Sequence, residues 1–192
     1  FIIPAEGGTA RQVSHGNFMH RGTAQWTPDG KGLLFSSNRN ENWEYDYVNS
    51  EIYHLNLENQ QYTTLTDRQG PDYNPVVSSD GKKIAYLGYT DKVQTYQINE
   101  LNIMDIDGSN KKQIKFKLDR KIQSLNWSKN NDALYCTYDN FGDTKIAKID
   151  LKGKVSIIAE NLGGTAFGRP YGGGSYSLSN DDAIAYTFTS TE

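Results

Sequence analysis

The chain has 192 residues, a formal net charge of -3 at pH 7, and 36% hydrophobic, 12% aromatic and 22% charged residues. This length suits one domain or two small ones. The weak negative charge gives no basic signature for nucleic-acid binding. No apolar run approaches the roughly 18 residues that a membrane helix needs. A single cysteine, Cys136, excludes an internal disulfide framework and a CxxC zinc site.

The two ends of the chain give little information about targeting. The sequence begins with FIIPAEGG, which has no initiator Met and no charged n-region, and stops at TFTSTE within a strand-like run. We interpret both ends as cut from a longer polypeptide. Because no apolar run is long enough for a membrane helix, we expect a soluble protein. With the N-terminus missing, the sequence does not choose between the cytoplasm and the periplasm.

Four segments share one pattern: an apolar residue, a small hydroxyl residue, a turn of Asp, Gly or Asn, and an alternating apolar strand. They are QWTPDGKGLLF at 25–35, VVSSDGKKIAY at 76–86, NWSKNNDALYC at 126–136 and SLSNDDAIAY at 177–186. Their lead apolar residues, Trp26, Val77, Trp127 and Leu178, are spaced by 51, 50 and 51 residues. Asp-Gly and Asn-rich turns between such runs predict tight β-hairpins, because these residues tolerate a positive φ.

A second hairpin follows in each full repeat, at 51–66, 100–116 and 145–158, and residues 1–14 have the same outer-hairpin pattern. One unit is thus four antiparallel strands in about 50 residues, a period typical of repeat architectures. Such a sheet cannot bury both faces alone, and radial stacking solves this in a β-propeller. A β-sandwich does not require a constant period. We predict an all-β protein, a β-propeller of four-stranded antiparallel blades that forms an incomplete arc of a larger ring.

The repeat also predicts the organisation of the chain. Residues 1–20 supply the outer hairpin of a preceding blade, residues 21–70, 71–120 and 121–164 form three blades, and residues 165–192 form the inner hairpin of a further blade. The open ends of such an arc expose sheet faces and unpaired edges. We therefore expect self-association through these edges.

The phrases WTPDGKGLLF and SSDGKKIAY resemble the WD-like propeller repeat of the TolB type. Three longer stretches, SSNRNENWEYDYVNSEIYHLNL, MDIDGSNKKQI and GRPYGGGSYSLSNDDAIAYTFTST, resemble the propeller of prolyl oligopeptidase family serine peptidases. The acylaminoacyl-peptidase and dipeptidyl-peptidase-like branch is the most similar. The resemblance implies a C-terminal α/β-hydrolase domain with a Ser-His-Asp triad in the same parent chain, and a peptide substrate.

The chain itself contains no nucleophile elbow of the G-x-S-x-G type. In the nearest stretch, GGGSYS, Ser177 occupies the place of the final glycine and no βαβ pattern surrounds it. We assign no catalytic residue and expect this chain alone to be inactive. DIDGSN at 105–110 begins like a calcium loop, but Phe116 holds the twelfth position, so we interpret it as a turn. We expect no metal and no cofactor.

The connections between the second and third strands of each repeat differ in length. They span 37–50, 88–99 and 139–143. Because strands alternate in direction, these loops emerge on the same rim as the links between blades. The links span 67–72, 117–121 and 160–174. Chain length and chemistry are therefore concentrated on one rim, while the short turns occupy the other.

The long-loop rim carries aromatic side chains mixed with arginines and acids, and aromatics and arginine dominate interface energies. The candidate substrate-binding or partner-binding residues are Arg39, Glu41, Trp43, Glu44, Tyr45, Tyr47, Tyr89, Tyr96, Arg169 and Tyr171. The resemblance implies that Glu41 and Glu44 could hold the α-ammonium group of a peptide, as acidic propeller residues do in the dipeptidyl-peptidase branch. Alternatively, these residues only order the long loops.

Three functional hypotheses follow. The leading one is a non-catalytic propeller portion of a prolyl-oligopeptidase-type serine peptidase, which caps the catalytic cavity and gates or binds peptides. The alternative is a TolB-type protein-binding scaffold without a catalytic domain. A carbohydrate-active propeller is a third hypothesis, although its paired catalytic carboxylates cannot be identified.

Overall fold

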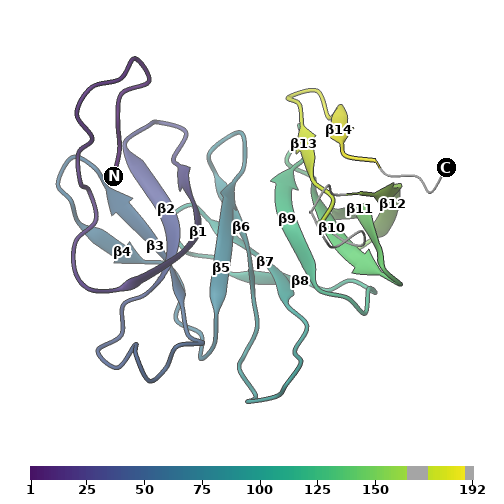
Figure 1. Ribbon diagram of the computed structural model, residues 1–192, viewed down its shortest axis with the longest axis horizontal. Helices are drawn as coiled ribbons and strands as arrows, with labels where there is room; N and C mark the ends of the chain where they lie inside the picture. Colours follow the sequence, from purple (N-terminus) through teal and green to yellow (C-terminus); the bar gives the residue numbers. More distant parts are fainter. Residues whose placement is uncertain (164–172, 189–192) are drawn as a thin grey trace.

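The computed structural model describes residues 1–163 and 173–188. These residues form strands and turns and contain no helix, so none of them provides a helix that could cross a membrane. Three four-stranded antiparallel sheets stand side by side along the molecule, and a two-stranded sheet follows the third (Figure 1).

Within each sheet the strands lie in chain order, each paired with its sequence neighbours. The first sheet contains β1 (Met19–Trp26), β2 (Gly32–Asn38), β3 (Glu51–Asn56) and β4 (Tyr62–Thr64). The second contains β5 (Asp72–Val77), β6 (Lys83–Gly88), β7 (Glu100–Asp105) and β8 (Lys112–Ile114). The third contains β9 (Ile122–Trp127), β10 (Ala133–Asn140), β11 (Asp143–Asp150) and β12 (Val155–Leu162), and the last contains β13 (Tyr176–Leu178) and β14 (Ile184–Tyr186). The predicted all-β fold of antiparallel propeller blades is confirmed, and the exact blade boundaries remain predictions.

The hydroxyl residue of each repeat closes the inner hairpin. Thr27 Oγ1 accepts a hydrogen bond of 2.8 Å from the amide of Gly32 and donates one of 2.6 Å to Asp29 Oδ1. Ser78 and Ser128 likewise accept from the amide five residues later, at 2.9 and 3.1 Å. These bonds satisfy turn amides that have no ladder partner, which is why a small hydroxyl recurs at this position.

A β-bulge interrupts the inner strand of each of the three four-stranded sheets. The pairing register shifts within β1, β5 and β9. In each bulge one residue adopts a left-handed conformation: Gly22 with φ 69°, Asn74 with φ 51° and Ser124 with φ 56°. Bulges bend a strand and change the direction of neighbouring side chains. The repeat therefore extends to an irregularity that the hydrophobic pattern does not predict.

The sheets are joined by two different core clusters. Between the first and second sheets lie Leu34, Ile52, Leu65, Ile84, Tyr86 and Met104. A larger cluster joins the second and third sheets and includes Leu87, Leu101, Ile122, Leu125, Trp127 and Leu134. In the larger cluster, Trp127 Nε1 donates a 3.0 Å hydrogen bond to the carbonyl of Val76 in the preceding sheet. Trp26 holds the same repeat position but is 53% exposed, because no described sheet precedes β1.

The short turns of neighbouring sheets also contact one another. Ser79 donates from its amide and its hydroxyl to Asn131 Oδ1, both at 3.0 Å, and the amide of Lys129 donates to Asp182 Oδ1 at 2.8 Å. We call the contact between the first and second sheets the first joint, and that between the second and third sheets the second joint. At the corresponding positions of the first joint are Pro28, which has no amide hydrogen, and Gly81, which has no side chain. These two pack directly, since a Cβ added to Gly81 would lie 3.1 Å from Pro28 Cγ.

Candidate functional site

The long-loop rim contains the structural differences between the repeats. The β2–β3 loop, residues 39–50, and the β6–β7 loop, residues 89–99, both extend from the lower edge of the sheets in Figure 1. In the third sheet, by contrast, a two-residue turn at 141–142 joins β10 to β11. Among the described residues, the long loops between the second and third strands therefore lie on the rim of the first and second sheets.

A cavity of about 430 Å³ lies where the first and second sheets meet on this rim, and we call it the joint pocket. Its lining includes three tyrosines, two cationic residues and the bulge residue of β5: Tyr47, Tyr73, Tyr89, Arg21, Lys121 and Asn74. The volume lies within the range of small-molecule and peptide sites. The inner strands β1 and β5 both contribute to it, so the pocket opens beside the strands that would line a propeller channel.

A second cavity of about 820 Å³, the loop pocket, adjoins the first and shares Tyr89 with it. Residues of the β6–β7 loop form most of its wall. Its charged lining residues are Lys92, Glu100 and Asp119. Acids and a base thus stand together in the loop pocket, whereas the charged residues of the joint pocket are both basic.

The structure brings three of the predicted rim residues to these cavities. Tyr47 is 66% exposed and lines the joint pocket, together with the partly buried Tyr89. Tyr96 lines the loop pocket, and Lys121 Nζ lies 4.9 Å from the centroid of its ring. Lys121 therefore stands between the two cavities.

Arg39 faces a different part of the molecule. Its guanidinium carbon lies 4.3 Å from the centroid of the Phe18 ring and 4.2 Å from that of Tyr62, and its Nη2 donates to the carbonyl of His15 at 3.1 Å. These contacts attach the N-terminal segment to the first sheet. Arg39 lines neither pocket.

The remaining predicted residues lie apart from the two cavities. Glu41, Trp43, Glu44 and Tyr45 form the tip of the β2–β3 loop; both acids are exposed and Tyr45 is 87% exposed. None of the four lines either pocket. Arg169 and Tyr171 lie outside the described residues.

Sequence reasoning did not single out Arg21, Tyr73, Asn74 or Lys121. Arg21 and Lys121 stand far apart in the chain, on a strand of the first sheet and on the link before β9. The only local signal was a residue tolerant of positive φ within a predicted strand, Gly22 in β1 and Asn74 in β5. That signal marks a bulge but does not show which side chains gather around it.

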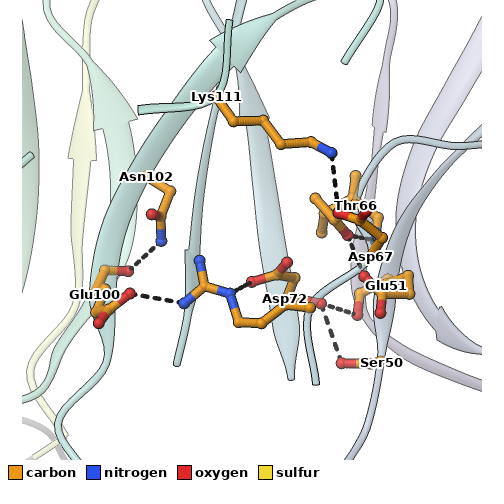
Figure 2. Close-up of polar contacts among 11 residues, drawn as sticks. Ser50, Glu51, Thr66, Asp67, Asp72, Glu100, Asn102 and Lys111 are labelled. Carbon is orange, nitrogen blue, oxygen red and sulfur yellow. Dashed lines mark hydrogen bonds and ion pairs between the residues drawn. The ribbon is translucent and has the colours of Figure 1, made fainter. Parts of the chain in front are cut away.

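A polar network lies next to residues that line the joint pocket, and Figure 2 shows its contacts. Arg68 Nη1 lies 2.7 Å from Glu100 Oε2 and its Nε lies 3.2 Å from Asp72 Oδ1. The hydroxyl of Thr66 donates to Glu51 Oε2 at 2.5 Å. The β4–β5 link is therefore connected to β3, β5 and β7 through polar and charged side chains.

The main chain of Asp72 fixes the same region. Its amide donates to the carbonyl of Ser50 at 2.7 Å, and its own carbonyl accepts from Ser50 Oγ at 3.1 Å and Ser36 Oγ at 2.9 Å. Ser50 and Pro71 form a parallel bridge, and both line the joint pocket. The network thus holds the β4–β5 link against β3 and sets the position of the pocket floor.

Burial shifts both acids of this network. Desolvation raises the pKa of Glu51 to about 7, against the opposing hydrogen bond from Thr66. Desolvation also raises the pKa of Asp72 to about 6, although the nearby Arg68 charge opposes it. Asp72 Oδ1 is buried and accepts no hydrogen bond from a described residue. Near neutral pH, ionising both buried carboxyl groups therefore lowers the stability of the folded chain.

Among the described residues, no three His, Cys, Asp or Glu side chains gather in a way that could hold a metal ion. What the rim offers is two concave surfaces lined by tyrosines and charged groups. Such surfaces suit binding, because aromatic and basic side chains contribute most to interface energies.

Comparison with known proteins starts from a negative result: no protein-family model matches the chain. Dipeptidyl-peptidase 5 of Porphyromonas gingivalis is 24% identical over 138 residues, which is 70% of this chain and 20% of that protein. Dipeptidyl-peptidase 5 of Porphyromonas endodontalis is 39% identical over 62 residues, 31% of this chain and 9% of that protein. The chain therefore spans a fifth or less of the curated relatives it matches.

Solved structures give the fold. A TolB structure from Acinetobacter baumannii superposes with a TM-score of 0.64 and 19% identity, covering 96% of this chain and 41% of that one. The chain folds as blades of a TolB-like β-propeller. Puromycin hydrolase superposes with a TM-score of 0.63 and 14% identity, covering 79% of this chain and 25% of that one. The resemblance to TolB propellers and to prolyl-oligopeptidase-type propellers, expected from the sequence, is confirmed.

Proposed function

We propose that this chain is the non-catalytic propeller portion of a prolyl-oligopeptidase-type serine peptidase. In this proposal it caps the cavity of a C-terminal α/β-hydrolase domain of the same parent chain and binds or gates peptide substrates. The observation that carries the proposal is the similarity to dipeptidyl-peptidase 5, which extends over 138 residues and so over more than one repeat. A shared turn motif alone would not produce a match of that length.

The rim geometry supports a role in binding. The two adjacent cavities lie on the rim that carries the long loops. The first and second sheets both line the joint pocket, whereas the second sheet and the link after it line the loop pocket. A peptide entering beside the inner strands would meet Tyr47 and Tyr89, whose flat side chains offer apolar contact and a hydroxyl at a small loss of conformational entropy. The loop tip with Glu41, Trp43, Glu44 and Tyr45 would then contact the hydrolase domain.

The experiment compares the parent polypeptide with the 192-residue chain. Both are treated with a serine-directed fluorophosphonate and with acyl-peptide and X-Pro reporter substrates. We expect labelling and turnover in the parent and neither in the chain alone. In the parent, Tyr47→Ala and Tyr89→Ala should raise KM, while Phe141→Ala, which removes a 95% exposed aromatic side chain of the β10–β11 turn outside both pockets, serves as the control. An unlabelled and inactive parent would contradict the peptidase proposal.

A second candidate function is a TolB-type protein-binding scaffold without a catalytic domain. It is favoured by the TolB superposition, which covers 96% of this chain. The partner would then be another protein, held by the same long-loop rim. The same fluorophosphonate experiment separates the two functions, because a scaffold gives no labelling.

We also propose that the chain self-associates through its open sheet faces. Trp26 on β1, Ile157 and Ile158 on β12 of the third sheet, and Phe188 after β14 are each at least 45% exposed. Exposed apolar side chains at an unpaired face favour association. A monomeric mass by light scattering would count against it.

A further inference from the structure

The charge of the joint pocket is opposite to that expected for a site that holds a peptide ammonium group. Its lining contains Arg21 and Lys121 and no aspartate or glutamate. Among the described residues, neither basic side chain forms an ion pair with a carboxylate. Most other basic groups around the first joint are paired, as Arg68 is with Glu100 and Lys111 with Asp67.

The guanidinium of Arg21 is held in place. Its Nη2 donates to the carbonyl of Tyr47, and its Nε lies 3.3 Å from Met19 Sδ. These contacts leave Nη1 without a hydrogen bond to any described residue. Lys121 Nζ lies 4.9 Å from the centroid of the Tyr96 ring and forms no hydrogen bond or ion pair with a described residue. A fixed guanidinium and an ammonium group that line one pocket, both with free donors, suit an anion.

The backbone brings the two sheets close together at this point. A Cβ added to Gly22 would lie 2.7 Å from Asn74 Oδ1, so the bulges of β1 and β5 are in direct contact. Arg21 directly precedes Gly22, and Tyr73 directly precedes Asn74. The paired bulges therefore set the direction of two lining side chains, which makes this a built site rather than a chance grouping of surface bases.

The pocket walls are neutral and can donate hydrogen bonds. Burial raises the pKa of Tyr73, and its hydroxyl accepts a 3.1 Å hydrogen bond from Asn99 Nδ2. The Tyr73 hydroxyl proton is thus free to donate to a ligand. With no acid in the lining, the two basic residues give the pocket a net positive charge.

The neighbouring loop pocket provides the contrast. There two acids, Glu100 and Asp119, stand beside one base, Lys92, so acidic groups outnumber basic ones. Glu41 and Glu44, the acids expected to hold an ammonium group, line neither cavity. No described acid therefore lines the joint pocket beside Arg21, and this pocket offers no site for an ammonium group.

We propose that the joint pocket binds a carboxylate of a peptide, with Arg21 and Lys121 as the charged contacts and Tyr47, Tyr73 and Tyr89 as the walls. That the ligand is a peptide rests on the proposed function, whereas the anionic preference rests on the pocket alone. The carboxylate comes either from the C-terminus or from an Asp or Glu side chain, and the test distinguishes these two sources.

The test uses three acetylated tetrapeptides and the 192-residue chain, with binding followed by NMR shift titration. The first is tetra-alanine with a free C-terminus, the second its carboxamide, and the third a carboxamide with one alanine replaced by glutamate. We expect the first, the third, or both to bind about tenfold more tightly than the neutral carboxamide, equivalent to about 1.4 kcal/mol. Equal binding of all three, or no binding of any, would overturn the proposal.

Matched variants locate the site. Arg21→Gln and Lys121→Gln should each weaken the carboxylate peptide several-fold and leave the weak binding of the carboxamide unchanged. Lys92→Gln, an exposed lysine of the loop pocket, should leave both unchanged. If Lys92→Gln weakens binding as much as the pocket variants, the charge effect is not local and the proposal fails. Arg21→Lys, which keeps the charge, controls for a folding defect.

The inference and the proposed function fail separately. Carboxylate-dependent binding by the chain, combined with an unlabelled parent, would keep the anionic pocket and reject the peptidase. Fluorophosphonate labelling of the parent, combined with equal binding of all three peptides, would do the reverse.

Discussion

The joint between the first and second sheets and the joint between the second and third sheets come from the same repeat, yet their interiors differ. The second joint is apolar, with Trp127 packed among leucines and isoleucines and its indole hydrogen-bonded to Val76. The first joint has a smaller apolar cluster and buries Glu51, Asp72 and part of Arg68 beside it. The polar joint is the one next to the two rim cavities: its Ser50 and Pro71 line the joint pocket, and its Glu100 lines the loop pocket.

This difference indicates a division of roles between the two joints. A well-packed apolar joint stabilises through burial, whereas a buried ionic network contributes less and depends on geometry and pH. The charged groups of the network are stable only when paired with one another, so they hold the β4–β5 link in one position. This link forms the floor of the joint pocket. Stability is thus concentrated at the second joint, and positional specificity at the first.

The largest effect expected from this comparison is the loss of the Trp127 side chain. Trp127→Ala removes a buried indole and its hydrogen bond, and should lower the free energy of unfolding by about 3–5 kcal/mol. Trp26→Ala, at the same repeat position but exposed, should cost about 1 kcal/mol or less. Urea denaturation of both variants measures this, and similar losses would show that the second joint does not depend on packing.

The next effect tests whether the first joint depends on charge. Arg68→Met leaves Asp72 without its ion pair, and should lower the free energy of unfolding by about 3 kcal/mol at pH 8. At pH 5 the loss should shrink, because the pKa of Asp72, already about 6, rises further without Arg68 and the carboxyl becomes neutral. Arg120→Met, on the exposed link before β9, is the control. Equal losses at the two pH values would exclude charge as the cause.

Glu51 gives a smaller effect of opposite sign. Its folded pKa of about 7 lies above the ordinary value of 4.5, so the native state binds the proton more tightly than the unfolded chain. Stability conferred by this group is therefore complete at low pH and is lost as the pH rises toward 7. Glu51→Gln should be more stable than the parent sequence at pH 8 by about 2 kcal/mol.

The pH profile of that variant provides the check. The decline in unfolding free energy between pH 6 and 7 should disappear, while the part due to Asp72 below pH 6 should remain. Glu58→Gln, which removes an exposed acid outside this network, is the control and should keep the decline between pH 6 and 7 that Glu51 causes. A Glu51→Gln profile that still falls between pH 6 and 7 would assign the titration to another group.

The smallest effect concerns the short turns. Asn131→Gly keeps the left-handed backbone, with φ 56°, but removes the acceptor for Ser79, and so makes the second joint resemble the first. We expect a loss of about 1 kcal/mol, since these are exposed neutral hydrogen bonds. Asn130→Gly in the same turn controls for the added chain entropy. A loss no greater than that of the control would mean that the turn contacts do not stabilise the joint.

Much of the fold was predictable because its signals are local. The spacing of Trp26, Val77 and Trp127, together with hydroxyl and Asp-Gly turns, predicts the hairpins that the structure contains. The bulges were not predictable, since a single Asn74 or Ser124 within a strand pattern does not show a shift in register. Local chemistry thus fixes the sheets but leaves their irregularities undetermined.

The rim was less predictable than the sheets. Loop length drew attention to Tyr47 and Tyr89, which line the joint pocket, and their role in binding stays a prediction. Arg39 could not be placed from sequence, because Phe18 and Tyr62, which enclose it, come from separate segments. Arg21 and Lys121 meet only through the packing of three sheets, so no spacing rule connects them.

The contacts between short turns also have a consequence for the order of the repeats. Pro28 packs against the glycine opposite it, whereas the amides of Ser79 and Lys129 each donate a hydrogen bond to a side-chain oxygen of the next sheet. Exchanging the second and third repeats would place Asn131 opposite Pro28, where no amide hydrogen is available, and would leave the amide of Lys129 facing Gly81, which has no side-chain oxygen. The turn residues of each repeat therefore specify which repeat can lie next to it. Shuffling, duplicating or circularly permuting these repeats would require the contacting turn residues to be exchanged together.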